Sequence, residues 1–148
     1  MINRKTKTSI ATLVALISLF FGSKYFEQDH SADQSHQAKQ ATSIEQLFAQ
    51  RQSGVMVQFD GEVIKKLPDD NKGSRHQKFI VRLINQHTVL IAHNIDLAPR
   101  VPISVNNVVT IFGQYEWNEK GGVVHWTHHD PNGSHEHGWI RHQGKIYQ

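Results

Sequence analysis

Histidine is the residue type whose distribution in this chain points most directly to chemistry. Six of the eleven histidines lie in the last 24 residues, within the segment 125–137 and at position 142. Imidazole titrates near neutral pH and is the commonest metal ligand in proteins. This density predicts a functional cluster that binds a metal or an anion or transfers a proton, and solvated loop histidines are the alternative.

The alternation of side chains along an extended strand indicates which residues of this segment are candidate metal ligands. If residues 124–130 are extended, alternate side chains share a face, so His128 and Asp130 lie on the same side. His135 and His137 are also two residues apart. We expect these four side chains to converge as a site for zinc or another divalent metal. No established zinc motif such as H-E-x-x-H is present, and solvated histidines remain the alternative.

A second group of polar side chains flanks two predicted strands and comprises Arg75, His76, His93, Asn94, Asp96 and Arg100. A tight antiparallel turn between the strands brings these two flanks together. Arginine offers a planar fork for phosphate or carboxylate, and aspartate can orient a histidine. We expect a ligand-binding patch here, on the same side of the fold as the histidine-rich segment. An Asp96–Arg100 ion pair and an Asn94 side chain bonded to its own loop are the alternative.

Aromatic residues extend the predicted binding surface. Tyr115, Trp117, Trp126 and Trp139 are candidates for packing in the core. An exposed pair of them is instead a stacking platform for bases or sugar rings. Glu116 and Trp117 are therefore included in the predicted ligand-binding surface.

The amino-terminal region has the pattern of an export signal. Basic residues at positions 4–7 precede an uncharged apolar run at 10–21, which is short for a stable membrane span. We interpret residues 1–24 as a signal peptide or an uncleaved membrane anchor, followed by a flexible linker over 25–41. Either reading predicts an exported protein in the periplasm, soluble or anchored to the inner membrane.

Charge and cysteine content narrow the classes of partner. The formal charge is +3, but removing the four basic residues of 1–24 leaves 12 Lys and Arg against 13 Asp and Glu. A broad basic surface is therefore missing, and duplex DNA is not expected as a partner. A small anionic, sugar or single-stranded nucleic-acid ligand remains compatible. Because cysteine is absent, there are no disulfides and no thiol nucleophile, and any metal ligands are nitrogen or oxygen.

A short helix is predicted to precede the strands. Thr42 and Glu45 fit a capping box, and Ile44, Leu47 and Phe48 form an apolar stripe at helical spacing.

Beyond the helix the apolar pattern changes to a period of two. It predicts strands at 55–67, 79–83, 88–92, 109–115 and 123–128, and a last hairpin over 139–147. Residues 94–107 contain two prolines and are expected to form an irregular crossover. This order of elements, a meander, then a long connection, then a hairpin, is typical of an OB-fold. We therefore predict that residues 42–148 form an all-β, OB-fold-like antiparallel Greek-key barrel with a short leading helix. An SH3-type barrel or sandwich is the alternative.

Several segments resemble a bacterial family of short exported proteins of unknown function. They contain the strings GSRHQ (73–77), HNIDLAPR (93–100), YEWN (115–118) and HWTHHDP (125–131). The resemblance covers about Val55 to Tyr147, and the histidine–tryptophan segment is its most specific part. It implies an exported small domain and supplies no catalytic residues.

Two functional hypotheses follow, and whether the chain is an enzyme is left open. The first is a binding module whose Arg, His and Trp surface holds an anionic or sugar-containing ligand. The second is a metal-assisted phosphodiesterase or nuclease, in which a histidine-bound cation activates water and Arg75 or Arg100 stabilises the developing charge. A structural domain with pH-sensitive histidines is a third reading.

Overall fold

The computed structural model describes residues 42–148. The predicted signal or anchor (1–24) and the predicted linker (25–41) lie outside the described residues. Among residues 42–148, no helix has both the length and the apolar character needed to cross a membrane.

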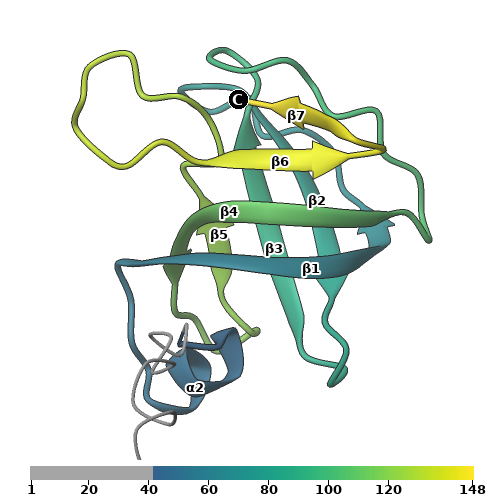
Figure 1. Cartoon of the computed structure of the whole chain (residues 1–148), viewed down its shortest axis with the longest axis vertical. Coiled ribbons are helices and arrows are strands. Elements are labelled where there is room, and N and C mark those ends of the chain that lie inside the picture. Colours follow the sequence, from purple (N-terminus) through teal and green to yellow (C-terminus); the bar gives the residue numbers. More distant parts are fainter. Residues whose placement is uncertain (1–41) are drawn as a thin grey trace, which may run out of the picture. The chain divides into compact units, whose positions relative to one another are not determined.

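One short helix and seven strands make up this part of the chain (Figure 1). In chain order the elements are α2 (Ile44–Ala49), β1 (Val55–Lys66), β2 (His76–Arg82), β3 (Thr88–Asn94), β4 (Val108–Glu116), β5 (Val123–His125), β6 (Trp139–His142) and β7 (Lys145–Tyr147).

Five strands close into a barrel in the order β1-β2-β3-β5-β4, because β4 pairs back onto β1. All of these pairings are antiparallel except β3–β5, which is parallel. Strand β6 extends the sheet from β4, and β7 pairs with β6. The OB-fold-like barrel predicted from the element order is therefore confirmed, with one added hairpin.

Strand β1 takes part in both halves of the barrel. Its residues Val55–Glu62 pair with β4, and its residues Glu62–Lys66 pair with β2, with an irregular register between Val63 and Lys65. At this change of partner, a Cβ atom on Gly61 would lie 2.8 Å from Cβ of Val81. The glycine therefore permits the close approach that the bend in β1 requires.

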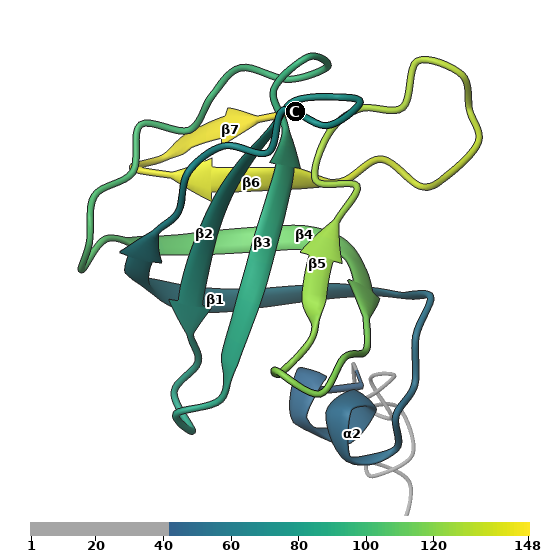
Figure 2. The same ribbon diagram turned by 180° about the vertical axis from the view of Figure 1, so that it is seen from behind.

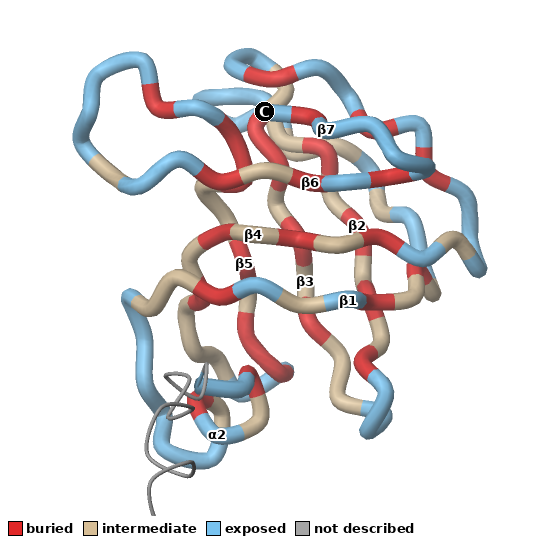
Figure 3. The backbone as a smooth tube through the Cα atoms, viewed as in Figure 1, coloured by how far each residue is buried: buried red, intermediate tan, exposed pale blue. Residues whose placement is uncertain are grey.

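Alternate residues of each barrel strand point into the core, which Figure 3 shows as alternating burial along the tube. The largest fully buried side chains include Phe79 of β2, Ile91 of β3, and Ile111 and Tyr115 of β4. Burial of these side chains is the main favourable contribution to folding in a domain without disulfides.

Helix α2 covers one end of the barrel with the predicted apolar stripe, because Ile44 and Leu47 are buried. The predicted capping residues are wrong by one position. Ser43 is the N-cap, its hydroxyl accepts from the Gln46 amide at 3.3 Å, and the Gln46 side chain accepts from the Ser43 amide at 3.2 Å. A Gln at this position closes the box as well as the predicted Glu does.

Strand β5 ends at His125, three residues earlier than predicted. The cause is Trp126, whose φ of 53° takes the chain out of the extended conformation. The expected alternation of side chains between two faces therefore fails after His125: Thr127 and His128 are adjacent in the sequence, and both are buried. The predicted last hairpin is confirmed, with a turn at Gln143 and Gly144 between β6 and β7.

We predict that Gly138→Ala destabilises the domain by about 2 kcal/mol or more. A Cβ atom there would lie 2.0 Å from the carbonyl oxygen of Trp126 and 2.5 Å from that of Phe112, and backbone cannot move aside cheaply. Denaturant unfolding of the full-length chain measures the loss. The matched control is Gly73→Asn, because its site is open and asparagine tolerates the positive φ. An unchanged midpoint for Gly138→Ala would show that the backbone rearranges there.

Candidate functional site

The two predicted groups of polar residues meet at one end of the barrel. Strand β2 begins there, and β3 and the parallel β5 both end there (Figure 2). A 2.9 Å contact between His93 Nδ1 and Thr127 Oγ1 joins the end of β3 to the segment after β5. We call this the histidine end of the barrel, defined by His76, His93, His125, His128 and His135. Whether the two groups form one binding site stays a prediction.

His93 is fully buried and belongs to the inward-facing row of β3. Its Nε2 lies 3.2 Å from the Pro99 carbonyl oxygen, which can only accept a hydrogen bond. The neutral ring therefore carries its proton on Nε2, and Nδ1 accepts from the Thr127 hydroxyl. The pKa of His93 is lowered from 6.5 to about 4, mainly by burial, with a smaller contribution from the nearby His128. His93 is thus a neutral structural histidine at pH 7.

Gln77 completes the polar layer beside His93. Its side-chain amide donates to the Val101 carbonyl at 2.8 Å, and its side-chain carbonyl accepts from the Val101 amide at 3.0 Å. These bonds fasten the predicted crossover, residues 94–107, across the histidine end. The buried polar groups are paired, so the layer seals this end of the core instead of forming an open site.

Asp130 organises the loop that follows β5. Its carboxylate accepts backbone hydrogen bonds from Asn132 and His135, each at 2.9 Å, and from Ser134. Its own amide donates to Nδ1 of His137 at 2.9 Å. The Asn132 amide and the other backbone bonds lower the pKa of Asp130 to about 2. The carboxylate therefore stabilises the loop in its ionised form across the physiological pH range.

The rings of this loop stack on each other. The His135 ring lies parallel to Trp126, with 4.2 Å between centroids, and meets His128 edge-on at 5.3 Å. The rings of His129 and His137 stack at 4.0 Å. These contacts hold the imidazoles as packed rings along the loop.

The predicted metal ligands lie in the same loop, but each makes hydrogen bonds to a different backbone group. His128 and His135 each have Nδ1 at 2.8 Å from the carbonyl oxygen of the following residue, and the Asp130 carboxylate holds the loop backbone. Within residues 42–148, no group of three or more His, Asp or Glu side chains is placed to hold a metal ion. Binding of zinc or another divalent metal stays a prediction.

The predicted arginines form ion pairs that brace neighbouring loops. Arg75 contacts Asp96 through its backbone amide and through Nε, each at 2.7 Å. Arg100 pairs through both terminal nitrogens with Asp69, in the loop between β1 and β2. The Asp96–Arg100 pair, which was the alternative reading of these residues, is not formed, because Asp96 pairs with Arg75 and Arg100 pairs with Asp69. Both pairs are partly exposed, so their contribution to stability is small.

Two other predicted residues also have local partners. The Asn94 side chain accepts from the Asp96 amide at 2.9 Å, as in the expected bond to its own loop. Nδ1 of His76 lies 2.7 Å from the Ser74 carbonyl oxygen.

Trp117 is not at the histidine end, whereas Glu116 reaches it through His125. Trp117 packs at α2, where its Nε1 donates to the Phe48 carbonyl at 3.1 Å and the Arg51 guanidinium lies 5.3 Å from its ring centroid. Glu116 Oε1 is 3.7 Å from Nε2 of His125, which is buried without a hydrogen-bond partner. The predicted binding surface is therefore divided between two parts of the barrel.

A groove that the sequence analysis did not predict lies on the outer face of β2 and β3. It has a volume of about 230 Å³ and is bordered by the turn between β4 and β5. We call it the β2–β3 groove; its lining residues are Leu67, Ile80, Thr88, Val89, Leu90, Asn118, Lys120 and Gly122.

The sequence does contain a signal for this groove. Strand β2 includes the apolar run Phe79-Ile80-Val81, and β3 includes Val89-Leu90-Ile91. A strand with one solvated face alternates apolar and polar residues, so two unbroken apolar runs indicate apolar side chains on both faces. Ile80 and Leu90 are paired partners in the register and supply the outward-facing apolar pair.

We predict that the stability of the domain falls as the pH drops from about 6.5 towards 4. Unfolding returns the pKa of His93 from about 4 to 6.5, so the unfolded chain binds the extra proton. The full contribution of the neutral His93 side chain to the free energy of unfolding is present above pH 6.5. About 3 kcal/mol of it is lost by pH 4. Burial also lowers the pKa values of His125 and His128, which adds to the slope.

Denaturant unfolding between pH 4 and 8 measures this slope in the full-length chain. His93→Gln should flatten it, whereas His129→Gln, at an exposed position, should leave it unchanged. An unaltered slope in His93→Gln would contradict the assignment to His93.

We also predict that Asp130→Asn loosens the loop over 130–137. An amide group has one acceptor oxygen in place of two, so it cannot hold all three backbone amides. Hydrogen exchange at Asn132, Ser134 and His135 should become faster, while the core strands keep their protection. Glu136→Gln removes a charge at an exposed position of the same loop and serves as the control. Equal protection in Asp130→Asn would show that the ring stack alone holds the loop.

Comparison with known proteins places the chain in a family. A search of curated proteins finds no match for it. The profile of a family described as "Protein of unknown function (DUF3465)" matches residues 27–148, which include the whole barrel. The chain therefore belongs to this family of proteins of unknown function.

Proposed function

We propose that this protein is a binding module whose ligand occupies the β2–β3 groove. The ligand places an apolar group in the groove and an anionic group beside Lys120. The groove itself carries the proposal, because it joins an apolar floor to a cationic rim on the strands that OB-folds use for ligands. Fold analogy alone assigns no function, so the proposal rests on these side chains.

The floor of the groove fits an apolar group. Ile80 and Leu90 are half-buried and directly paired across the two strands, and Leu67 forms the adjoining wall. A volume of about 230 Å³ accommodates a short alkyl chain or a single ring. Binding there removes apolar surface from water, at about 25 cal/mol per Å² of buried area.

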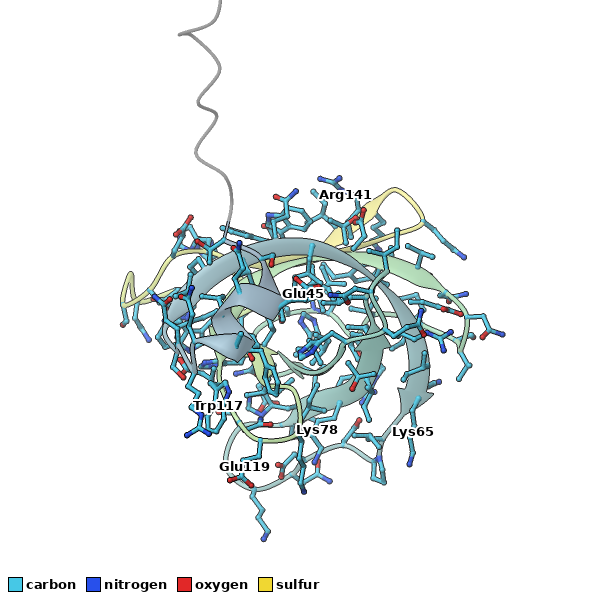
Figure 4. The ribbon with its side chains drawn as sticks, turned by 90° about the horizontal axis from the view of Figure 1, so that it is seen from below. Glu45, Lys65, Lys78, Trp117, Glu119 and Arg141 are labelled. Carbon is cyan, nitrogen blue, oxygen red and sulfur yellow. The ribbon has the colours of Figure 1, made fainter. Side chains whose placement is uncertain are left out.

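The rim of the groove favours an anionic group. Lys120 is exposed at the turn between β4 and β5 and belongs to the lining. Lys78 is one outward position along β2 from Ile80, and Asp70 lies 3.7 Å from its ammonium. Lys78 lies on the same side of the barrel as Trp117 and Glu119, away from Arg141 (Figure 4). An anion at this rim gains Coulomb energy without burying a lysine.

Among the ligand classes expected from the sequence, this face fits a small anion or an acidic sugar best. The outward-facing, partly exposed residues of β2 and β3 are His76, Lys78, Ile80 and Arg82, and Thr88, Leu90 and Ala92. Binding of single-stranded nucleic acid by OB-folds uses aromatic stacking platforms, and these seven positions hold no Phe, Tyr or Trp. The metal-assisted hydrolase and export to the periplasm stay predictions.

We predict that Lys120→Ala weakens binding of small anions by about fivefold, which is the effect of losing one exposed charge contact of about 1 kcal/mol. Hexanoate and glucuronate are the probes, titrated into the ¹⁵N-labelled full-length chain and followed by amide NMR shifts. Shifts should centre on residues 80, 88–90 and 118–122. Leu90→Trp should fill the groove and abolish them.

Two controls separate specific from general charge effects. Hexanol is the neutral counterpart of hexanoate and should bind more weakly to the wild type. Lys145→Ala removes an exposed cation from β7 and should change nothing. Shifts on another surface, or none with either anion, would refute the proposed groove.

A further inference from the structure

A second groove lies beside α2 and has a different chemical character from the β2–β3 groove. Its volume is about 380 Å³. We call it the α2 groove, and it is lined by the start of α2, by the middle of β1 and by the turn after β2: Thr42, Ser43, Ile44, Glu45, Val57, Gln58, Phe59, Asp60, Leu83 and Ile84.

The apolar part of the α2 groove includes an unusually exposed residue. Ile84 lies in the turn between β2 and β3 and is 99% exposed, and Phe59 of β1 is half-buried. Single exposed apolar residues are common on protein surfaces and need no explanation. Ile84 differs because it borders a groove whose floor includes the buried Ile44 and Leu83. All four side chains belong to the lining of the groove.

The charges around the α2 groove are acidic. Its lining contains two carboxylates, Glu45 and Asp60, and no Lys, Arg or His. Burial alone would raise the pKa of Glu45, but hydrogen bonds from Ser43 and from its own backbone lower it. Glu45 is therefore ionised at neutral pH, and Figure 4 shows it on α2 at the end of the barrel that this helix covers. The β2–β3 groove, in contrast, has Lys120 in its lining.

We propose that the α2 groove is an interaction surface for a polypeptide segment that presents an apolar side chain next to lysine or arginine. The apolar side chain packs against Phe59 and Ile84, and the cation lies beside Glu45 and Asp60. Charge complementarity selects this occupant, because an acidic segment would meet two like charges without a compensating cation in the lining. In protein interfaces a few buried anchors provide most of the affinity, and charges at the rim act mainly on specificity.

The surface is independent of the ligand proposed for the β2–β3 groove. Their lining residues do not overlap, and the signs of their charges are opposite. A protein with both grooves can bind a small anion and a cationic segment at the same time. Failure of one assignment leaves the other untouched.

Three capped tripeptides test the assignment by NMR titration of the ¹⁵N-labelled full-length chain. The first, acetyl-Lys-Phe-Lys-amide, has both required features. Acetyl-Lys-Ser-Lys-amide lacks the apolar side chain, and acetyl-Glu-Phe-Glu-amide reverses the charge. We expect the first to shift amides of residues 43–45, 57–60 and 83–84 and to bind at least fivefold more tightly than the other two.

Variants at exposed positions avoid confusion with unfolding. Ile84→Ser and Asp60→Asn should each weaken acetyl-Lys-Phe-Lys-amide about three- to tenfold without changing the unfolding midpoint. Val108→Ser removes another exposed apolar side chain, 65% exposed at the start of β4, and should have no effect. Raising the salt concentration should weaken binding of the wild type and should affect Asp60→Asn less.

Three outcomes would overturn the assignment. The first is equal binding of acetyl-Glu-Phe-Glu-amide, and the second is unchanged binding by Ile84→Ser. The third is a set of shifts at the same residues on concentrating the protein alone, which would identify a second copy of the chain as the occupant.

Discussion

Closure of the barrel depends on β1, which pairs with β4 along its first part and with β2 along its last part. Gly61 makes this change of partner sterically possible, because a side chain there would collide with Val81. With β1 bent, β4 closes the barrel against it, and β3 and β5 pair as the one parallel pair among the described strands. That pair places the end of β3 beside the end of β5, so the histidine end is a result of closure.

The histidine end illustrates how buried polar side chains can close one end of a barrel. His93 and Gln77 face inward and bind the backbone of Pro99 and Val101, which draws the crossover over the opening. Their hydrogen-bonding capacity is used inside the protein, so little of it is left for a ligand. The two grooves have a different arrangement: they combine apolar floors with charged side chains in the lining. The density of histidines in the sequence indicates where polar side chains gather. Only the structure distinguishes side chains that hold the fold together from side chains that are available to a ligand.

The period-two pattern and the element order were sufficient to predict the barrel, because both are properties of the local sequence. The length of β5 was not predictable in this way, since the strand ends at the positive φ of Trp126, and a tryptophan in an apolar alternation gives no signal for that conformation. The partner of Arg100 could not be predicted either, because Asp69 comes from a loop 31 residues away and many pairings were compatible with the spacing. The β2–β3 groove was indicated by apolar runs in two strands, but its depth depends on the turn between β4 and β5, which approaches only in the folded barrel.

The pairing of β1 with β4 also has a consequence for the rate of folding. The first pair in its register, Val55 and Tyr115, is separated by about 60 residues, whereas β2 and β3 are joined by a short turn. The hairpin of β2 and β3 can therefore form early at a low entropic cost, but it cannot become part of a closed barrel until the distant strands meet. Until then, the apolar residues on both faces of this hairpin stay exposed to other chains. Slow closure would thus make association between unfolded molecules the main competitor of folding.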